Sequence, residues 1–539
     1  MDLILDQAHI ADLTLSKDIR LPDTPTLREA MAGDEQEQWL AAIRDKLDAI
    51  REAGTWTLVA RTPGIQNIVG CRFVLQKKRG ENGQVTKFKA QLVAQGFSQW
   101  EGVDFSETFA PVVKSALLHV FLTICAQKGW NVHQMDIKSA YLNAPITEDI
   151  YTSQPKGFEE VGRENLVAKL NKGLYGLKQA GREWYAMLRD FLISIGFRRT
   201  HADHSVFVFE WGSSIVIIPV YVNDELLARN DDRTLDSIQA QIGARFKASN
   251  LGTASWILGI RVRHNLTKGT LFIDQLQYIK TILECFNMTG CNTVLIPLEA
   301  KSYFMPATPE DHKLVKSFPY LEAIGSLMYA AMGTRPDISA AVRSLSPFAS
   351  NFGAVHIAAV KHIFKYLARC PNQGILYSHD GSTLVGWTDA DWANDRTNRK
   401  LISGHIFMLA GGAISWMSKQ QVSVVTSSTH VEYVAATEAA KELVWLRRFL
   451  LELCQDIPNS TVLYIDNCAA DLLAWNPVNH SVTKHIEVRY HYIRECIQDG
   501  SITLKLISTK DMAADVLTKS LDRLKHDCFC QMFGMEVME

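Results

Sequence analysis

One short acidic segment restricts the fold of this chain more than any other feature. Residues 221–224, with the sequence Tyr-Val-Asn-Asp, lie between the apolar runs 215–220 and 226–228, which predicts a tight hairpin between two strands. Asp136 lies in a second apolar, strand-like segment. Two strand-borne acids favour phosphoryl-transfer chemistry, because a pair of Mg²⁺ ions about 4 Å apart needs hard oxygen ligands.

The charge pattern is informative locally rather than globally. The 539 residues are enough for about three domains, and their net charge of −2 shows no overall preference for a nucleic acid. One stretch of the chain is basic. Its only nearby acid is Glu81, and its basic residues are Arg72, Lys77, Lys78, Arg79, Lys87 and Lys89. Charge alone fits a phosphate-binding surface and a solvated basic face about equally well.

The cysteines and the apolar runs indicate an intracellular protein. None of the ten cysteines belongs to a Cys-x-x-Cys pair, which favours reduced thiols. No N-terminal segment resembles a signal peptide, and the longest apolar run, 215–222, is too short to cross a bilayer. We therefore expect residence in the cytoplasm, the nucleus or both, with no membrane partner.

The order of predicted elements changes along the chain. Residues 26–53 have apolar side chains at helical spacing, and Asn82-Gly83 joins two strand-like runs as a hairpin turn. Further helices are expected at 112–127 and 182–195. From Leu384 the pattern predicts three consecutive strands, a long helix and another strand, which is the layout of the ribonuclease H fold.

Several longer motifs agree with one known family. The chain resembles the reverse transcriptase and ribonuclease H region of copia-type long-terminal-repeat retrotransposon polyproteins from about Asp23 to about Leu521. The segments that carry the resemblance include HQMDIKSAYLNAPITEDIYTSQPKGF, LYGLKQAGREWY, YVND, IGSLMYAAMGTRPDISAAV and KHIEVRYHYIRE. The resemblance implies an α+β fold, with the palm, fingers and thumb of a polymerase right hand followed by a ribonuclease H-like α/β domain.

The expected domain boundaries follow from this resemblance and from composition. Residues 1–54 form an N-terminal helical segment, and 55–296 form the fingers, palm and a thumb-like part. Residues 297–383 are a linker and connection region, 384–525 form the ribonuclease H-like domain, and 526–539 are a C-terminal tail.

The resemblance assigns the polymerase metal site to the hairpin and the earlier acid. Asp136 and Asp224 are expected to be catalytic ligands of two Mg²⁺ ions, with Mn²⁺ as a substitute. Relatives carry Tyr-Val-Asp-Asp at the hairpin, so Asn223 stands at a catalytic position. Its amide has no charge to balance a divalent ion, and we expect polymerase activity to be absent or severely reduced.

The resemblance also assigns nucleotide contacts, which are Lys89, Tyr141, Gly176 and Lys178. Tyr141 stands where relatives place an aromatic ring beneath the nucleotide ribose, although an ordinary core tyrosine is the simpler interpretation without that context. Gln91 and Gln95 replace basic residues, and Gly181 replaces a proline, which weakens the expected grip on the triphosphate or template.

A second acidic site is expected near the C-terminus. Its four members occupy separate elements in the order of the ribonuclease H site, and they are Asp389, Glu432, Asp466 and Asp515. Four acids can hold two Mg²⁺ around one phosphodiester. Each acid alone is more often a cap or turn residue. His430 replaces a glutamate of relatives, and His485 matches a family histidine without a clear role.

These features lead to two functional hypotheses. The first is a retrotransposon-derived RNA-directed DNA polymerase with a ribonuclease H domain, whose partners are an RNA template, a DNA primer, an RNA–DNA hybrid and deoxynucleoside triphosphates. The second is a catalytically silent relic or a recruited nucleic-acid-binding protein. Asn223 favours silence of the polymerase, whereas the complete set of four C-terminal acids argues against a general loss of activity.

Overall fold

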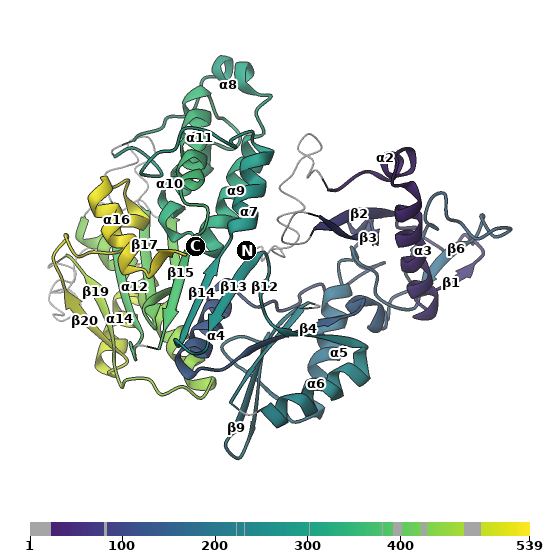
Figure 1. The fold of residues 1–539 in the computed structure, drawn as a ribbon, viewed down its shortest axis with the longest axis horizontal. Coiled ribbons are helices and arrows are strands. Elements are labelled where there is room, and N and C mark those ends of the chain that lie inside the picture. Colours follow the sequence, from purple (N-terminus) through teal and green to yellow (C-terminus); the bar gives the residue numbers. More distant parts are fainter. Residues whose placement is uncertain are drawn as a thin grey trace.

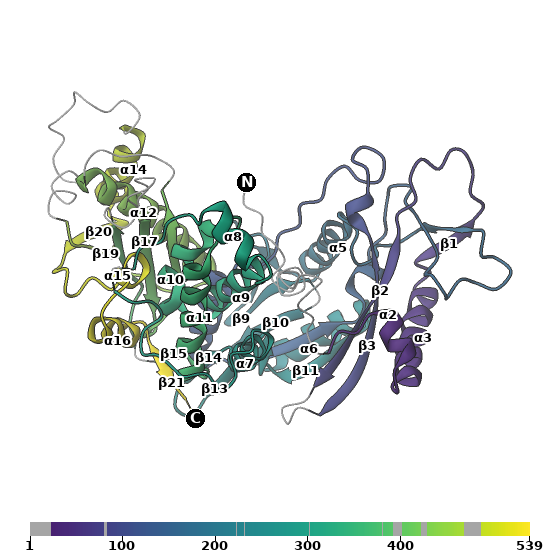
Figure 2. The same cartoon turned by 90° about the horizontal axis from the view of Figure 1, so that it is seen from above.

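The computed structural model describes residues 23–79, 84–222, 224–230, 232–300, 302–379, 381–391, 402–421, 428–467 and 487–538. Three features of the sequence interpretation lie outside these ranges: the Asn82-Gly83 turn, Asn223 and His485. The N-terminal elements lie at one end of the molecule, the hairpin-bearing sheet lies below the middle, and the later helices and strands form the other end (Figure 1). Figure 2 shows the same succession from above.

The N-terminal end combines two helices with short sheets. Its elements are α2 (Leu27–Ala32), α3 (Gln36–Glu52), β1 (Trp56–Val59), β2 (Cys71–Arg79), β3 (Val85–Ala94), β5 (Tyr151–Thr152) and β6 (Val167–Leu170). The single helix expected at 26–53 is two helices, because the chain is extended at Gly33. Trp39 and Ile43 of α3 are buried. The Trp39 ring packs edge-on against that of Phe88 of β3, with 4.7 Å between the ring centres. This packing attaches α3 to the β2–β3 hairpin.

A six-stranded antiparallel sheet forms the palm. The strand order is β11-β4-β10-β9-β8-β7, and the bounds are β4 (Val132–Ile137), β7 (Arg198–Arg199), β8 (Val206–Trp211), β9 (Ser214–Tyr221), β10 (Asp224–Arg229) and β11 (Ala248–Thr253). Three helices pack on it: α4 (Ser115–Lys128), α5 (Ala180–Ser194) and α6 (Asp232–Phe246). Leu226 belongs to the core of α4 and Leu227 to the core of α5 and α6, so alternate residues of β10 face opposite layers.

The next sheet joins segments that are far apart in the sequence. Its order is β12-β13-β14-β15-β21, with β12 (Trp256–Ile257), β13 (Ile260–Asn265), β14 (Thr270–Asp274), β15 (Gln373–Ser378) and β21 (Met535–Val537). The accompanying helices are α7 (Leu276–Cys285), α8 (Pro309–Val315), α9 (Tyr320–Gly333), α10 (Ser339–Leu345) and α11 (Ala354–Arg369). The segment 526–539, expected to be a tail, contains most of a helix and β21, because β21 completes this sheet by pairing with β15.

The last sheet has the order β18-β17-β16-β19-β20, with β16–β18 antiparallel and β16, β19 and β20 parallel. The bounds are β16 (Val385–Asp391), β17 (Ile402–Leu409), β18 (Gly412–Gln420), β19 (Thr461–Ile465) and β20 (Ile502–Leu506). Its helices are α12 (Ser428–Glu452), α14 (Glu487–Gln498), α15 (Asp515–Thr518) and α16 (Arg523–Met532). This is the predicted ribonuclease H-like layout, and together with the palm it confirms the α+β fold.

The palm and the ribonuclease H-like sheet share one hydrophobic core. Buried side chains of α4, such as Phe121, belong to the same cluster as Ile414 of β18 and Leu446 of α12. At the edge of this interface, the Trp445 indole donates a hydrogen bond to the Ala202 carbonyl at 2.9 Å. In the described part of the chain, no helix combines the length and apolar character needed to cross a membrane.

Candidate active sites

The first acid pair lies on two neighbouring strands of the palm. Asp136 on β4 is directly opposite Asp224, the first residue of β10 after the hairpin turn. Both side chains are half-buried. The structure therefore brings together two of the carboxylates that the sequence assigned to metal binding. Asn223, the third predicted residue of this site, lies outside the described residues.

The charges of this pair act on each other. Burial, and then the neighbouring Asp136, raise the pKa of Asp224, while a hydrogen bond with Gln134 and the charges of Lys89 and Lys78 oppose that rise. Two neighbouring carboxylates are suitable oxygen ligands for a divalent cation. The geometry of β4 and β10 therefore fits the predicted metal-binding role.

A third acid lies beside this pair on the opposite face of β10. Glu225 is only 1% exposed and belongs to the layer covered by α5 and α6. Neither of its carboxylate oxygens has a hydrogen-bond partner among the described residues. Burial, and then Asp224 and Asp136, raise the pKa of Glu225 well above its ordinary value. It faces away from Asp224 along the pleated strand, so it adds no ligand to the pair.

Lys46 of α3 is a candidate site residue that the sequence interpretation missed. Its ammonium donates a hydrogen bond to the Ser139 hydroxyl at 3.3 Å and lies 5.6 Å from the centre of the Tyr175 ring. Burial, and then the charge of Lys89, lower the pKa of Lys46 to about 8. No local sequence pattern indicates these contacts, because they come from segments 90 or more residues away.

The predicted ribose-contacting ring lies next to this lysine. Tyr141 is in a short 3₁₀ turn after β4, and its ring centre is 4.5 Å from that of Tyr175. The charges of Asp136 and Asp224 contribute, after burial, to a raised pKa of Tyr175, so the two tyrosines lie near the acid pair. The structure therefore places Tyr141 near the acids, and its contact with a ribose stays a prediction.

The loop that carries Gly176 and Lys178 packs against the end of β3. Gly176 has a φ of +90°, and a Cβ atom there would lie 2.2 Å from the Ala94 carbonyl oxygen, so only glycine fits. The exposed Lys178 holds its ammonium 4.3 Å from the centre of the Phe105 ring. These contacts join the loop to β3, but they do not bring Lys178 into contact with the acid pair.

The basic residues of the β2–β3 hairpin divide between its two faces. Lys78 lies opposite Lys87, and Gln76 lies opposite Lys89, on the face away from α3. Lys77 faces α3 instead and forms an ion pair with Glu35 at 2.5 Å. The prediction treated Lys77 and Lys78 as one phosphate-binding group, and the alternation of side chains along β2 separates them.

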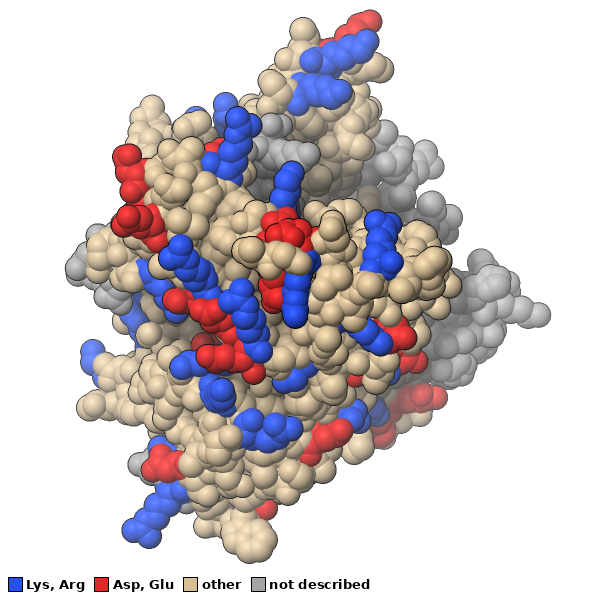
Figure 3. Space-filling model, turned by 90° about the vertical axis from the view of Figure 1, so that its right-hand side faces the viewer, with Lys and Arg blue, Asp and Glu red and all other residues tan. Residues whose placement is uncertain are grey.

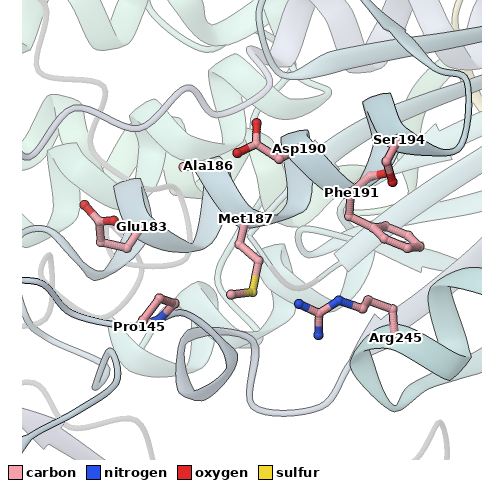
Figure 4. A pocket seen from close by; sticks show the side chains of 8 residues that line it. All are labelled: Pro145, Glu183, Ala186, Met187, Asp190, Phe191, Ser194 and Arg245. Carbon is pink, nitrogen blue, oxygen red and sulfur yellow. The ribbon is translucent and has the colours of Figure 1, made fainter.

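Neither the charge on one face of the molecule nor a cavity beside α5 marks a single binding site. Figure 3 shows Lys and Arg side chains interspersed with Asp and Glu on the right-hand side of the molecule. A cavity of about 440 Å³ lies between α5 and α6, where Arg245 extends toward Met187 (Figure 4). Its lining includes Glu183 and Asp190 but none of the predicted catalytic residues.

The second acid site is assembled by three elements of the ribonuclease H-like sheet. Asp389 lies near the end of β16, Asp466 directly follows the parallel neighbour β19, and Glu432 lies in the first turns of α12. Because Trp387 pairs with Tyr464, the two aspartates lie at the same level of the sheet. One carboxylate oxygen from each of the three acids lies within 4.8 Å of the others.

Burial determines the protonation of this group. Burial, and then Asp389 and Asp466, raise the pKa of Glu432 to about 9. Burial also raises the pKa of Asp389 to about 6, although the nearby Lys519 opposes the rise. Three carboxylates at this spacing, one buried and two half-buried, fit a divalent cation. Asp389, Glu432 and Asp466 would be the ligands.

The fourth predicted acid is held differently. Asp515 begins α15, and its side chain is 1% exposed. Its Oδ1 atom lies 2.7 Å from the Lys519 ammonium, and its Oδ2 atom lies 2.5 Å from the Lys525 ammonium. The structure therefore brings Asp515 to the site, but it joins Asp515 to two lysines that the sequence interpretation did not consider.

Glycine at one position permits this arrangement. A Cβ atom at Gly404 of β17 would lie 2.8 Å from the Thr518 side chain and 2.9 Å from that of Leu517. The missing side chain lets α15 approach the sheet. As a result, the Thr518 hydroxyl reaches Asp389 and donates a hydrogen bond to its carboxylate.

Comparison with known proteins shows which family this chain resembles. A family model described as reverse transcriptase (RNA-dependent DNA polymerase) matches residues 53–300. The retrovirus-related Pol polyprotein from transposon TNT 1-94 of Nicotiana tabacum is 37% identical over 97% of this chain, and that from transposon RE1 of Arabidopsis thaliana is 38% identical over 94%. The chain spans only 40% and 34% of these two relatives.

Among solved structures, a foamy viral protease-reverse transcriptase in complex with double-stranded DNA aligns over 87% of this chain and 69% of its own. The identity is 12% and the TM-score is 0.44.

Proposed function

The chain belongs to the Pol polyprotein family of copia-type retrotransposons, and we propose that it combines a crippled RNA-directed DNA polymerase with a working ribonuclease H. The substrates would be an RNA template with a DNA primer, deoxynucleoside triphosphates, and the RNA strand of an RNA–DNA hybrid. The nuclease is the activity that the geometry supports best.

One observation carries the nuclease proposal. Asp389, Glu432 and Asp466 come from a strand, a helix and a strand end, yet their carboxylate oxygens lie within 4.8 Å of one another. A divalent cation bound there would supply Lewis acidity at a phosphodiester and lower the pKa of a bound water. The rigid β16–β19 pair fixes two of the ligands, and α12 presents the third, so little reorganisation precedes binding.

The polymerase proposal depends on a weaker site. Asp136 and Asp224 face each other across β4 and β10 and would contribute two carboxylates. Asn223 would add one carbonyl oxygen and no charge where relatives have an aspartate. Removing one preorganised electrostatic group typically lowers a rate by about 10²–10³, so primer extension should fall by at least that factor.

The test measures both reactions on one preparation of the whole chain. We expect degradation of the RNA strand of a hybrid with Mg²⁺ or Mn²⁺, together with very weak extension of a DNA primer on an RNA template. The Asp466→Asn variant should lower hybrid cleavage by at least about 10², because it removes charge from the acid group with little change in shape. Its binding of hybrid should change little, since phosphate contacts elsewhere supply most affinity.

Two results would contradict this proposal. The first is absence of cleavage by the unaltered chain with both metal ions, which would favour a silent protein that only binds nucleic acid. The second is full cleavage by Asp466→Asn, which would move the nuclease site away from these residues.

A further inference from the structure

Lys519 occupies an unusual place for a lysine beside a metal-binding group of acids. Its ammonium lies 3.1 Å from Asp389 Oδ2, 3.3 Å from Asp389 Oδ1 and 2.7 Å from Asp515 Oδ1. The Lys519 ammonium therefore bridges Asp389 and Asp515, which are two of the predicted metal ligands. A second divalent cation held by these two acids would have to occupy the same space.

Several contacts hold this lysine in place. Asp515 is the first residue of α15 and Lys519 directly follows its last residue, so this short helix separates the two partners of the ion pair. The Thr518 hydroxyl ties α15 to Asp389, and Gly404 permits the close approach. Its ammonium lies within ion-pair distance of both Asp389 and Asp515, so it occupies the space between the two carboxylates.

Lys525 completes the charge balance from the other side. Its ammonium lies 2.5 Å from Asp515 Oδ2, the carboxylate oxygen other than the Oδ1 atom that pairs with Lys519. Asp515 thus has both oxygens engaged by ammonium groups. With all four acids ionised, the two lysines leave a formal charge of −2, which one divalent cation balances.

We propose that Lys519 takes the place of the second metal ion, so that the nuclease site of this chain binds one divalent cation at Asp389, Glu432 and Asp466. In this arrangement Asp515 is a positioning residue for Lys519 rather than a metal ligand. This inference rests on the proposed ribonuclease H function, and it differs from the expectation of two ions held by four acids. The Lys519 ammonium supplies positive charge on the Asp515 side of the site. A phosphodiester bound between the divalent cation and this ammonium would lie beside that charge.

The experiment counts bound Mn²⁺ ions on the full chain by electron paramagnetic resonance and by calorimetry. The Asp136→Asn change is present throughout, so that ions at the palm do not contribute to the count. We expect one bound ion in this parent protein, and loss of that ion in the added Asp466→Asn variant. The Lys519→Met variant should bind two ions, because Asp389 and Asp515 become available as ligands.

Two matched variants separate position from charge. Lys519→Arg keeps a cation between the acids and should still bind one ion. Lys525→Met removes the lysine that pairs with the other oxygen of Asp515, and it should also bind one ion because Lys519 still occupies the bridge. Circular dichroism and thermal melting monitor the fold of each variant. The parent count decides the matter alone if Lys519→Met does not fold.

The outcomes distinguish the inference from the function on which it rests. Two ions in the parent, or one ion in a folded Lys519→Met variant, would overturn the role of Lys519 and leave a metal-dependent nuclease in place. No bound ion in the parent at millimolar Mn²⁺ would overturn the nuclease function, and the inference would fall with it.

Discussion

A single amide decides the charge of the polymerase site. Replacing Asn223 by aspartate would restore a third carboxylate beside Asp136 and Asp224. We therefore expect Asn223→Asp to increase primer extension by at least about 10², measured with Mg²⁺ on a DNA-primed RNA template. Asn265→Asp, which adds the same charge on β13, is the control and should leave extension unchanged. If primer extension stays equally weak in Asn223→Asp, the loss of basic residues at positions Gln91 and Gln95 becomes the next explanation.

The buried carboxyl of Glu225 should destabilise the folded state. Its buried carboxyl lacks hydrogen-bond partners among the described residues, and its pKa in the folded state is raised well above 4.5. The folded state therefore holds a proton that the unfolded chain releases, so stability is full below about pH 4.5 and declines as the pH rises. We expect Glu225→Leu to stabilise the protein by about 1–3 kcal/mol at neutral pH, with a smaller gain at acid pH.

Urea denaturation of the Glu225→Leu variant at several pH values measures this effect. Glu164→Leu changes an exposed glutamate and is the control, with an expected effect within about 0.5 kcal/mol. An equal gain for both variants, or a gain independent of pH, would contradict the assignment of a buried protonated acid.

Metal binding at the nuclease site should depend strongly on pH. The pKa of Glu432 is raised to about 9 and that of Asp389 to about 6, so a cation that binds both carboxylates must displace protons below those values. Apparent Mg²⁺ affinity should rise about tenfold per pH unit between pH 6 and 8, and more steeply below pH 6. Calorimetry in buffers of different ionisation enthalpy would detect the released proton, and a flat profile would exclude this coupling.

At the level of single residues, the sequence predicted the acidic site residues better than the basic ones. Strand-like surroundings and motif order were sufficient to select Asp136, Asp224 and Asp389, and the structure brings each of them to an acid group. Lys46 and Lys519 were not predicted as site residues, because lysines in or next to helices usually face solvent. Their importance comes from partners more than 90 residues away, which no local pattern reveals.

Among the elements, the β2–β3 hairpin offers the clearest test of nucleic-acid binding. Lys78 and Lys87 lie opposite each other on the face away from α3, whereas Lys77 is paired with Glu35. We expect Lys78→Gln and Lys87→Gln each to reduce the slope of log affinity against log salt by about one unit. Lys77→Gln is the matched control, since its charge is already balanced on the other face.

The measurement is fluorescence anisotropy of a labelled duplex over a range of salt concentrations. If Lys77→Gln flattens the slope as much as Lys78→Gln does, the hairpin binds nucleic acid through both faces. If none of the three variants changes the slope, these lysines form only a solvated face.

The sequence predicted long elements well and short ones poorly. The sequence located α4 and α5 within a few residues, because α4 is a long apolar segment buried on all sides and α5 buries residues at helical spacing. It missed the break at Gly33 and the three-residue strand β21, because so short a strand has no periodicity of its own. The order of strands in each sheet required the family resemblance, since pairings between distant segments leave no local signal.

For the whole molecule, the shared core predicts cooperative unfolding. Phe121 of the palm and Ile414 of the ribonuclease H-like sheet belong to one buried cluster, and Glu452 accepts hydrogen bonds from the backbone of His201 and Ala202. We expect segment 384–538 on its own to expose apolar surface, bind a hydrophobic dye and be digested rapidly by protease. The full chain should lose both regions in one thermal transition, and a compact, protease-resistant isolated segment would contradict this.

The pairing of β15 with β21 has a consequence in time as well as in space. Ile375 is synthesised 160 residues before its partner Met535. At about 5–20 residues per second, one edge of β15 would wait roughly 8–32 s on the ribosome before its partner emerges. An apolar strand with an open edge is a template for pairing with other nascent chains, so chaperone dependence during synthesis is the expected cost of this long-range closure.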